Sequence, residues 1–203
     1  MLRCRVLKIM KVSLGFKAHS GWAALIVLGA NGSEFEVIDR RRVELVEETW
    51  AKAPYHAAEE LEPAEARMIV NRGIKAAHKN AKRQMEALLK RTEKNGHKVT
   101  ACAVLMGAPM PDWSTDEILA VHFRMHKAEG VLFREALLEA AKASGLKFVP
   151  VPEKELGPFA AKVLQAPLDS LTSKIAALGK SIGPPWGKDQ KEATLAAMIA
   201  LHC

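Results

Sequence analysis

The sequence predicts a mixed α/β fold in which five strands form one sheet with helices on its faces. Three extended apolar segments come first, and two later apolar runs alternate with helix-forming stretches. The chain has 203 residues, of which 49% are hydrophobic, and this is enough for one sizeable core. Because no internal repeat or low-complexity linker divides the sequence, we expect residues 1–203 to form a single domain.

The first three strands are expected to form an antiparallel meander. Apolar residues 12–16 and 22–30 lie on either side of a turn-like segment, and Asn31-Gly32 is a strong hairpin signal before the extended residues 34–45. The basic N-terminus imitates a signal peptide, but the apolar run 22–30 is too short to span a bilayer. We therefore predict no membrane association.

Helices and strands alternate over the rest of the chain. Pro63 suits the first turn of a helix, and Asn95-Gly96 suits its end. A capping-box signature at Ser114 predicts a second helix that runs to about Ser144. The remaining expected elements are a buried strand at residues 99–106, a strand at 146–151, short helices at 158–165 and 168–178, and a last helix after the loop at 181–187.

The charge of the chain favours a polyanionic partner. The formal net charge is +7, and the first long helix carries a basic side with Lys75, Lys79 and Lys82. These lysines are candidate phosphate contacts, although the acidic residues between them also suit a solvated helix face. Aromatic residues make up only 5% of the chain, which argues against a platform for stacking bases.

The cysteines indicate a reducing compartment. They are far apart in the sequence and lack CxxC spacing, so neither a disulfide framework nor a zinc finger is predicted; they are Cys4, Cys102 and Cys203. We therefore expect a cytoplasmic protein.

The second half of the chain contains short segments that carry a family resemblance. They are residues 126–130 with 137–141, residues 145–152, and residues 189–193. In order, they describe a helix that ends in glycine, an edge strand, and an acidic pair that begins the last helix. This pattern resembles the RuvC-type Holliday-junction resolvases of the ribonuclease-H-like superfamily. Asp189 and Glu192 match the two acidic positions of the family's Asp-x-x-Asp-Ala motif, with Glu in place of the second Asp.

The resemblance implies a ribonuclease-H-like sheet and a nuclease site with two divalent ions, Mg²⁺ or Mn²⁺. Carboxylates from the first strand, the fourth strand and the last helix hold these ions in the family. In this chain Lys17 falls at the first-strand position, and residues 104–107 are uncharged. We therefore expect a catalytically degenerate relative, in which Asp189 and Glu192 are the surviving candidates for catalysis and metal binding.

The same residues also have other interpretations. Asp189 and Glu192 have the spacing of a capping box at a helix start. Lys17 could neutralise Asp189 in a salt bridge, which we favour, or it could join His19 and Lys188 in an anion site. Lys188 belongs to a Gly/Pro-rich loop, residues 183–188, whose composition also fits an ordinary surface turn.

One histidine pair has the spacing of a zinc site. His122 and His126 stand four residues apart, with Glu129 one turn further on. Because the order HExxH and paired cysteines are both missing, we interpret this segment as an amphipathic helix that carries polar residues.

The leading functional prediction is binding of nucleic acid, branched DNA included, through backbone phosphates and without cleavage. One alternative is a divergent metal-dependent nuclease that uses Asp189 and Glu192, and another is an interaction scaffold that touches no nucleic acid. The resemblance also implies a homodimer. The choice between DNA and RNA stays open.

Overall fold

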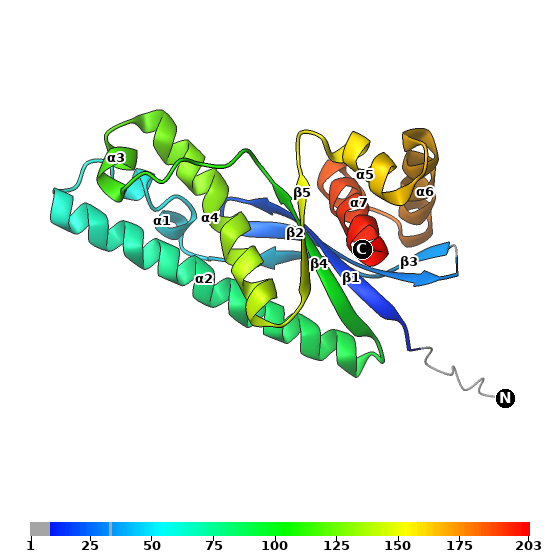
Figure 1. Ribbon diagram of the computed structural model, residues 1–203. Coiled ribbons are helices and arrows are strands. Elements are labelled where there is room, and N and C mark those ends of the chain that lie inside the picture. The colour runs from blue at the N-terminus through cyan, green and yellow to red at the C-terminus, as the bar shows by residue number, and fades with distance from the viewer. Residues whose placement is uncertain (1–8, 33) are drawn as a thin grey trace.

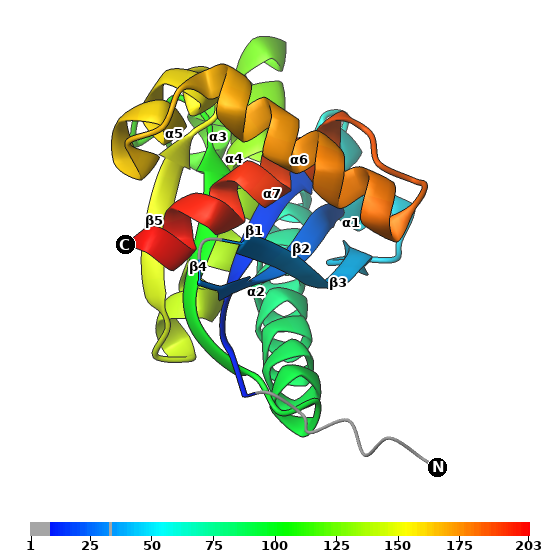
Figure 2. The same ribbon diagram turned by 90° about the vertical axis from the view of Figure 1, so that its right-hand side faces the viewer.

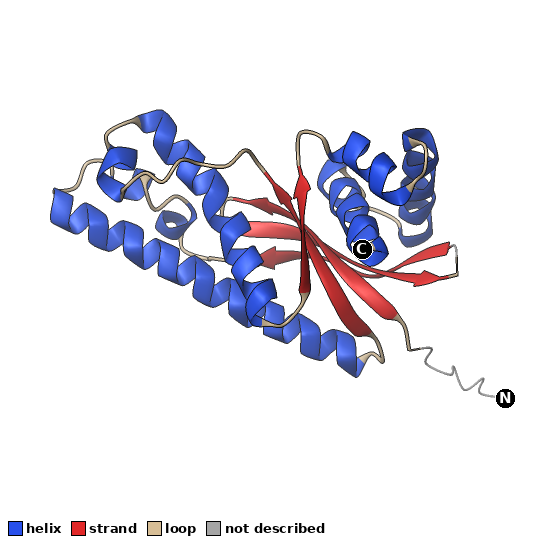
Figure 3. Cartoon of the chain, viewed as in Figure 1, coloured by secondary structure: helices blue, strands red, loops and turns tan. Residues whose placement is uncertain are grey.

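The computed structural model describes residues 9–32 and 34–203, and these contain a five-stranded mixed sheet (Figure 1, Figure 3). The strand order across the sheet is β3-β2-β1-β4-β5. The three N-terminal strands pair antiparallel, whereas β4 pairs parallel with β1 and β5 pairs parallel with β4. The predicted meander and the α/β class are confirmed. The strands are β1 (Lys11–His19), β2 (Trp22–Asn31), β3 (Glu34–Glu44), β4 (Lys98–Met106) and β5 (Lys147–Pro152).

Helices cover both faces of the sheet in two layers (Figure 1, Figure 2). The first layer contains α2 (Pro63–Lys94) and α4 (His122–Ala143), and the second contains α5 (Leu156–Leu164), α6 (Leu168–Ile182) and α7 (Lys188–His202). Three shorter elements complete the described chain: α1 (Thr49–Lys52), the 3₁₀ turn η1 (His56–Ala58) and α3 (Thr115–Leu119).

One helix prediction is wrong in its extent. The capping box at Ser114 is present, because the Glu117 backbone N–H donates to the Ser114 hydroxyl and the Glu117 carboxylate accepts from the Ser114 N–H. The helix that it starts ends at Leu119, and α4 begins only at His122. Neither a glycine nor a proline marks this break in the sequence, so no local signal announces it.

Side chains alternate along β1 and divide it between the two layers. Leu14 and Phe16 are buried against α2 and α4 in one core cluster. Ser13 and Gly15 face α7: the Ser13 hydroxyl donates to the Ala197 carbonyl oxygen at 2.7 Å, and a Cβ at Gly15 would lie 2.0 Å from the Ala193 carbonyl oxygen. The next residue on this face of β1 is Lys17, which therefore lies beside the first turns of α7.

Arg40 of β3 anchors the loop that leads into α7. Its guanidinium donates to the carbonyl oxygens of Gly183, Pro184 and Pro185 at 2.7, 3.1 and 2.7 Å. Trp186 fixes the other end of the loop, because its ring packs on Gly179 and its Nε1–H donates to a carbonyl of α6 at 3.1 Å. The loop is therefore held against β3 and α6 by these contacts, unlike the ordinary surface turn that its composition also fitted.

No described helix combines the length and the apolar character needed to cross a membrane. Cys4 lies outside the described residues. Cys102 is buried and Cys203 is exposed, both as free thiols.

Candidate functional site

The carboxyl ends of β1, β4 and β5 meet at one edge of the sheet, beside the N-terminus of α7. These three strands run parallel, so the residues that end them are brought to the same edge. Lys17 and His19 lie at the end of β1, and Glu153 follows β5 directly, with its N–H donating to the Met106 carbonyl oxygen at the end of β4. The first two turns of α7 add Asp189 and Glu192.

Lys17 lies at the centre of this cluster. Its ammonium donates to Glu153 Oε1 and contacts Glu192 Oε2 at 2.9 Å. Only 9% of the Lys17 side chain is exposed, so the charge is sheltered from water and held between two carboxylates. A buried charge is tolerated when it is paired in this way.

Arg134 of α4 holds the other side of Glu153. Its guanidinium contacts Glu153 Oε2 at 2.6 Å and donates to the Gly130 carbonyl oxygen at 2.8 Å. The same guanidinium lies against Gly107, where a Cβ would come within 2.8 Å of it. Gly107, the last residue of the window 104–107 in which a fourth-strand carboxylate was expected, therefore makes room for a cation.

His19 and Asp189 form a second contact in the cluster. His19 Nε2 lies 3.1 Å from Asp189 Oδ2 without the alignment of a hydrogen bond, so the contact is electrostatic when the imidazole is protonated. The imidazole stacks on Trp22, with ring centroids 4.3 Å apart, and Arg42 covers Trp22 at 3.8 Å. At the exposed rim, Lys188 lies 3.7 Å from Glu192.

Charges in the cluster are balanced. The cluster contains three carboxylates, those of Glu153, Asp189 and Glu192, and three permanent cations, those of Lys17, Arg134 and Lys188. Sites that hold Mg²⁺ or Mn²⁺ rely on carboxylate oxygens that are free to point at the ion. Here the buried oxygens already point at Lys17, so the residues do not fit a divalent ion in this arrangement.

The electrostatics strengthen the central ion pair. Burial is the largest influence on the pKa of Lys17 and would lower it, but the hydrogen bonds and charges of Glu153 and Glu192 together raise it above the usual 10.5. Burial would likewise raise the pKa of Glu153, but the hydrogen bond and charge of Lys17, with the charges of Arg134 and His19, bring it below the usual 4.5. Both groups therefore stay charged at neutral pH.

Two sequence-based interpretations of this region are wrong in detail. Lys17 does not pair with Asp189, because its partners are Glu153 and Glu192. The expected capping box of Asp189 and Glu192 is absent, because Gly187 is the N-cap of α7 and its N–H donates to Gln190 Oε1 at 2.9 Å. The helix begins two residues earlier than the pattern requires, and this leaves both carboxylates for the cluster.

Glu153 is the main residue that the sequence analysis missed. It lies 136 residues from Lys17 along the chain, and no motif surrounds it. Its position directly after an expected edge strand was the available signal, since parallel strands end at a common edge.

Lys75, Lys79 and Lys82 are exposed on α2, and none of them is ion-paired within the described ranges. Lys188 lies on α7, in the opposite layer (Figure 1, Figure 2). The fold thus separates Lys188 from the other three lysines. An anion site of Lys17, His19 and Lys188 stays a prediction that the geometry weakens, because each of them already faces a carboxylate.

Comparison with known proteins rests on structure alone, since no family model and no curated protein matches the sequence. RuvC of T. thermophilus in complex with a Holliday junction substrate aligns with a TM-score of 0.55 at 13% identity, over 93% of this chain and 92% of that one. A second structure of Thermus thermophilus RuvC aligns at 0.48 and 13% identity over the same shares. The yeast mitochondrial Holliday junction resolvase aligns at 0.40 and 10% identity, over 98% of this chain and 82% of that one. The strand order, the two helical layers and the first of these alignments agree, and this chain has a ribonuclease-H-like fold that is similar to the fold of that RuvC structure.

Proposed function

We propose that this protein binds nucleic acid through backbone phosphates and does not cleave it. The observation that carries the absence of cleavage is the buried ammonium of Lys17 between Glu153 and Glu192. A two-metal nuclease needs those oxygens for its ions, because the ions activate water and stabilise the leaving oxygen. With a lysine between the carboxylates, each ion would have to displace a fixed positive charge.

The exposed face of α2 supports the binding part of the proposal. Lys75, Lys79 and Lys82 follow one another at helical spacings of four and three residues, so their side chains project from one side of the helix. At about 1.5 Å of rise per residue, they extend over about 10 Å. Three exposed ammonium groups along such a line suit consecutive phosphates of a nucleic-acid strand, and the net charge of +7 acts in the same direction.

Branched DNA is the first ligand to test, because the RuvC structure of the same fold holds a Holliday junction substrate. We propose that the protein is cytoplasmic, as its cysteines indicate, and that it is a homodimer, as the family resemblance implies. Sedimentation equilibrium under the assay conditions measures its mass. Binding itself is measured by fluorescence anisotropy with a labelled four-way junction, a duplex and a single strand, each at several salt concentrations.

The decisive variant replaces Lys75, Lys79 and Lys82 with alanine. If all three contact phosphates, the slope of log K against log salt should become shallower by about 2 to 3, because each phosphate contact contributes about 0.9. The matched control replaces three exposed lysines elsewhere, Lys142, Lys162 and Lys180, and changes the net charge equally. An equal loss of affinity and an equal change of slope in both variants would show a general effect of charge. If the natural sequence did not bind at low salt, the interaction scaffold would become the working hypothesis.

A divergent nuclease is a second candidate, favoured by the convergence of three carboxylates on one edge of the sheet. The same junctions are therefore incubated with Mg²⁺ or Mn²⁺ and resolved on denaturing gels. We expect no cleavage by the natural sequence. Specific cleavage that disappears in the Asp189→Asn variant would overturn the proposal and identify a metal-dependent enzyme.

A further inference from the structure

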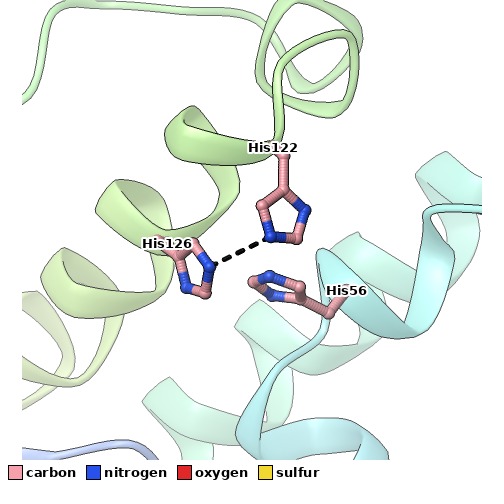
Figure 4. Close-up of side chains that lie close together, drawn as sticks. All are labelled: His56, His122 and His126. Carbon is pink, nitrogen blue, oxygen red and sulfur yellow. Dashed lines mark hydrogen bonds between the residues drawn. The ribbon is translucent and has the colours of Figure 1, made fainter.

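Three histidines from two separate elements converge in one place (Figure 4). His56 comes from η1, whereas His122 and His126 come from the first turns of α4. One ring nitrogen from each of the three lies within 4.8 Å of the others. The neighbouring small core packs η1, α2 and α3 against α4, so this group lies at the junction of several elements.

The two histidines of α4 have the separation that a tetrahedral metal requires. His122 and His126 are four residues apart, and their Nε2 atoms are 3.2 Å from each other. Two nitrogens bound to one tetrahedral Zn²⁺ at about 2.05 Å are about 3.3 Å apart. One ring nitrogen of His56 lies within 4.8 Å of a ring nitrogen of each of these two histidines.

Carboxylates contact the Nδ1 atoms of two of these histidines, His56 and His122. Glu129 is buried, and its Oε2 lies 2.7 Å from His56 Nδ1, whereas Glu59 Oε1 lies 3.1 Å from His122 Nδ1. A carboxylate on Nδ1 favours the tautomer in which Nε2 carries the free lone pair. This arrangement is the usual outer shell of histidines that bind a metal.

His56 provides a second and independent observation. Its Nε2 is buried and has no hydrogen-bond partner among the described residues. Glu129 also accepts from the backbone N–H groups of Tyr55 and His56, both at 3.1 Å, so its carboxylate is held in place beside the His56 ring. An unpaired buried nitrogen is costly unless something binds it.

We propose that His56, His122 and His126 bind a single borderline transition-metal ion of the Zn²⁺ class. Imidazole nitrogens suit Zn²⁺, Cu²⁺ and Ni²⁺, whereas Mg²⁺ and Ca²⁺ require oxygen ligands. Three protein ligands leave a fourth position for water or an exogenous group. Glu129 and Glu59 are positioning residues, and the metal links η1 to α4. This proposal does not depend on the proposed function.

The test uses the full-length untagged chain, stripped with a chelator and dialysed. Zn²⁺ is titrated in competition with a chromophoric indicator, and Co²⁺ is titrated with its visible spectrum as the readout. We expect about one ion per chain and a tetrahedral Co²⁺ spectrum. The His122→Ala and His126→Ala variants should each weaken binding by at least about 100-fold, and Glu129→Gln by about 10- to 100-fold.

His78→Ala is the matched control, because His78 also lies beside a carboxylate, that of Glu139, but at 3.3 Å on α2 and outside the cluster. It should bind Zn²⁺ like the natural sequence. Unchanged affinity in the His122→Ala/His126→Ala double variant, or an octahedral Co²⁺ spectrum, would overturn the proposal. If a variant fails to fold by circular dichroism, X-ray absorption of the natural protein with Zn²⁺ counts the imidazole ligands directly, and fewer than three would also overturn it.

Discussion

Lys17 determines the chemistry available at the end of β1. A carboxylate at this position would add a fourth negative group to Glu153, Asp189 and Glu192, whereas the lysine neutralises two of them. Its pKa is raised and that of Glu153 is lowered, so the pair is charged over a wide range of pH. The residue type at this one position therefore decides whether the carboxylates of Glu153 and Glu192 face a cationic side chain.

This ion pair makes stability depend on pH in a predictable direction. The folded-state pKa of Glu153 lies below 4.5, so its contribution is present above that value and is lost as the pH falls through the folded pKa. The folded-state pKa of Lys17 lies above 10.5, so its contribution is present below that value and is lost as the pH rises through the folded pKa. The pair therefore stabilises fully between these limits.

Glu153→Gln should lower the free energy of unfolding at neutral pH by about 1–3 kcal/mol, because it leaves Lys17 and Arg134 with weaker partners. Thermal unfolding of both proteins from pH 3 to 7 measures the difference, which should shrink below pH 4.5. The exposed pair of Arg67 and Asp116 provides the control, and Asp116→Asn should change Tm little. A difference that stays constant at low pH would exclude the ion pair as its cause.

Sequence reasoning at this scale identified Lys17 as the unusual residue but not its partners. Asp189 was expected to pair with Lys17 because it belongs to the acidic pair at the start of the last helix. The actual partners of Lys17 depend on where β5 ends and on where α7 begins. Glu153 follows β5, and the parallel pairing of β5 with β4 is part of the tertiary structure, which local sequence patterns do not reveal. The third histidine was missed for a similar reason, since His56 belongs to a short 3₁₀ turn without a periodic pattern.

At the scale of elements, the contact between α7 and β1 depends on small residues. Gly15 permits backbone contact with Ala193 and Ala197, and the buried face of α7 continues with Ala196 and Ala200. Because of this close approach, Asp189 and Glu192 in the first turns of α7 lie beside Lys17 and His19 at the end of β1. The helix and the site are therefore placed by the same contact.

Gly15→Ala should destabilise the protein strongly, because its new methyl group would meet a backbone oxygen that cannot rotate away. We expect a loss of at least about 3 kcal/mol, above the usual cost of overpacking. Gly29→Ala on β2 is the control, since its nearest neighbours would be side-chain carbons at 3.4 Å. Urea unfolding of both variants measures the two costs, and equal costs would show that the approach of α7 is adjustable.

Element boundaries show where sequence patterns are sufficient. Most strands were predicted well because they are apolar runs bounded by turn residues, and β3, which is charged over residues 39–42, followed from the hairpin signal Asn31-Gly32 before it. The break between α3 and α4 was not predicted, because Ala120 and Val121 carry no turn signal; it is decided by packing, with Ile118 and Met125 buried in the same core on either side of it.

At the scale of the whole molecule, one sheet joins two cores. Apolar residues on one face pack against α2 and α4, and those on the other pack against α5, α6 and α7. Neither layer has a sheet of its own, so neither should unfold alone. We therefore propose that the chain behaves as a single domain, as its composition predicts.

The four tryptophans test this proposal, because they are spread over both faces: Trp22, Trp50, Trp113 and Trp186. Tryptophan fluorescence and far-ultraviolet circular dichroism should give the same midpoint in urea, as in a two-state transition. Two separated midpoints would indicate that one helical layer detaches before the other.

The anchoring of the loop by Arg40 makes the far edge of the sheet part of the site. β3 is the edge strand on the side away from β5, yet its arginine fixes the three carbonyls that precede α7. The register of an edge hairpin thereby sets the position of Asp189 and Glu192. Because Glu192 contacts Lys17 and Asp189 faces His19, a hairpin at the opposite edge of the sheet from β5 thereby helps to hold the charge cluster together.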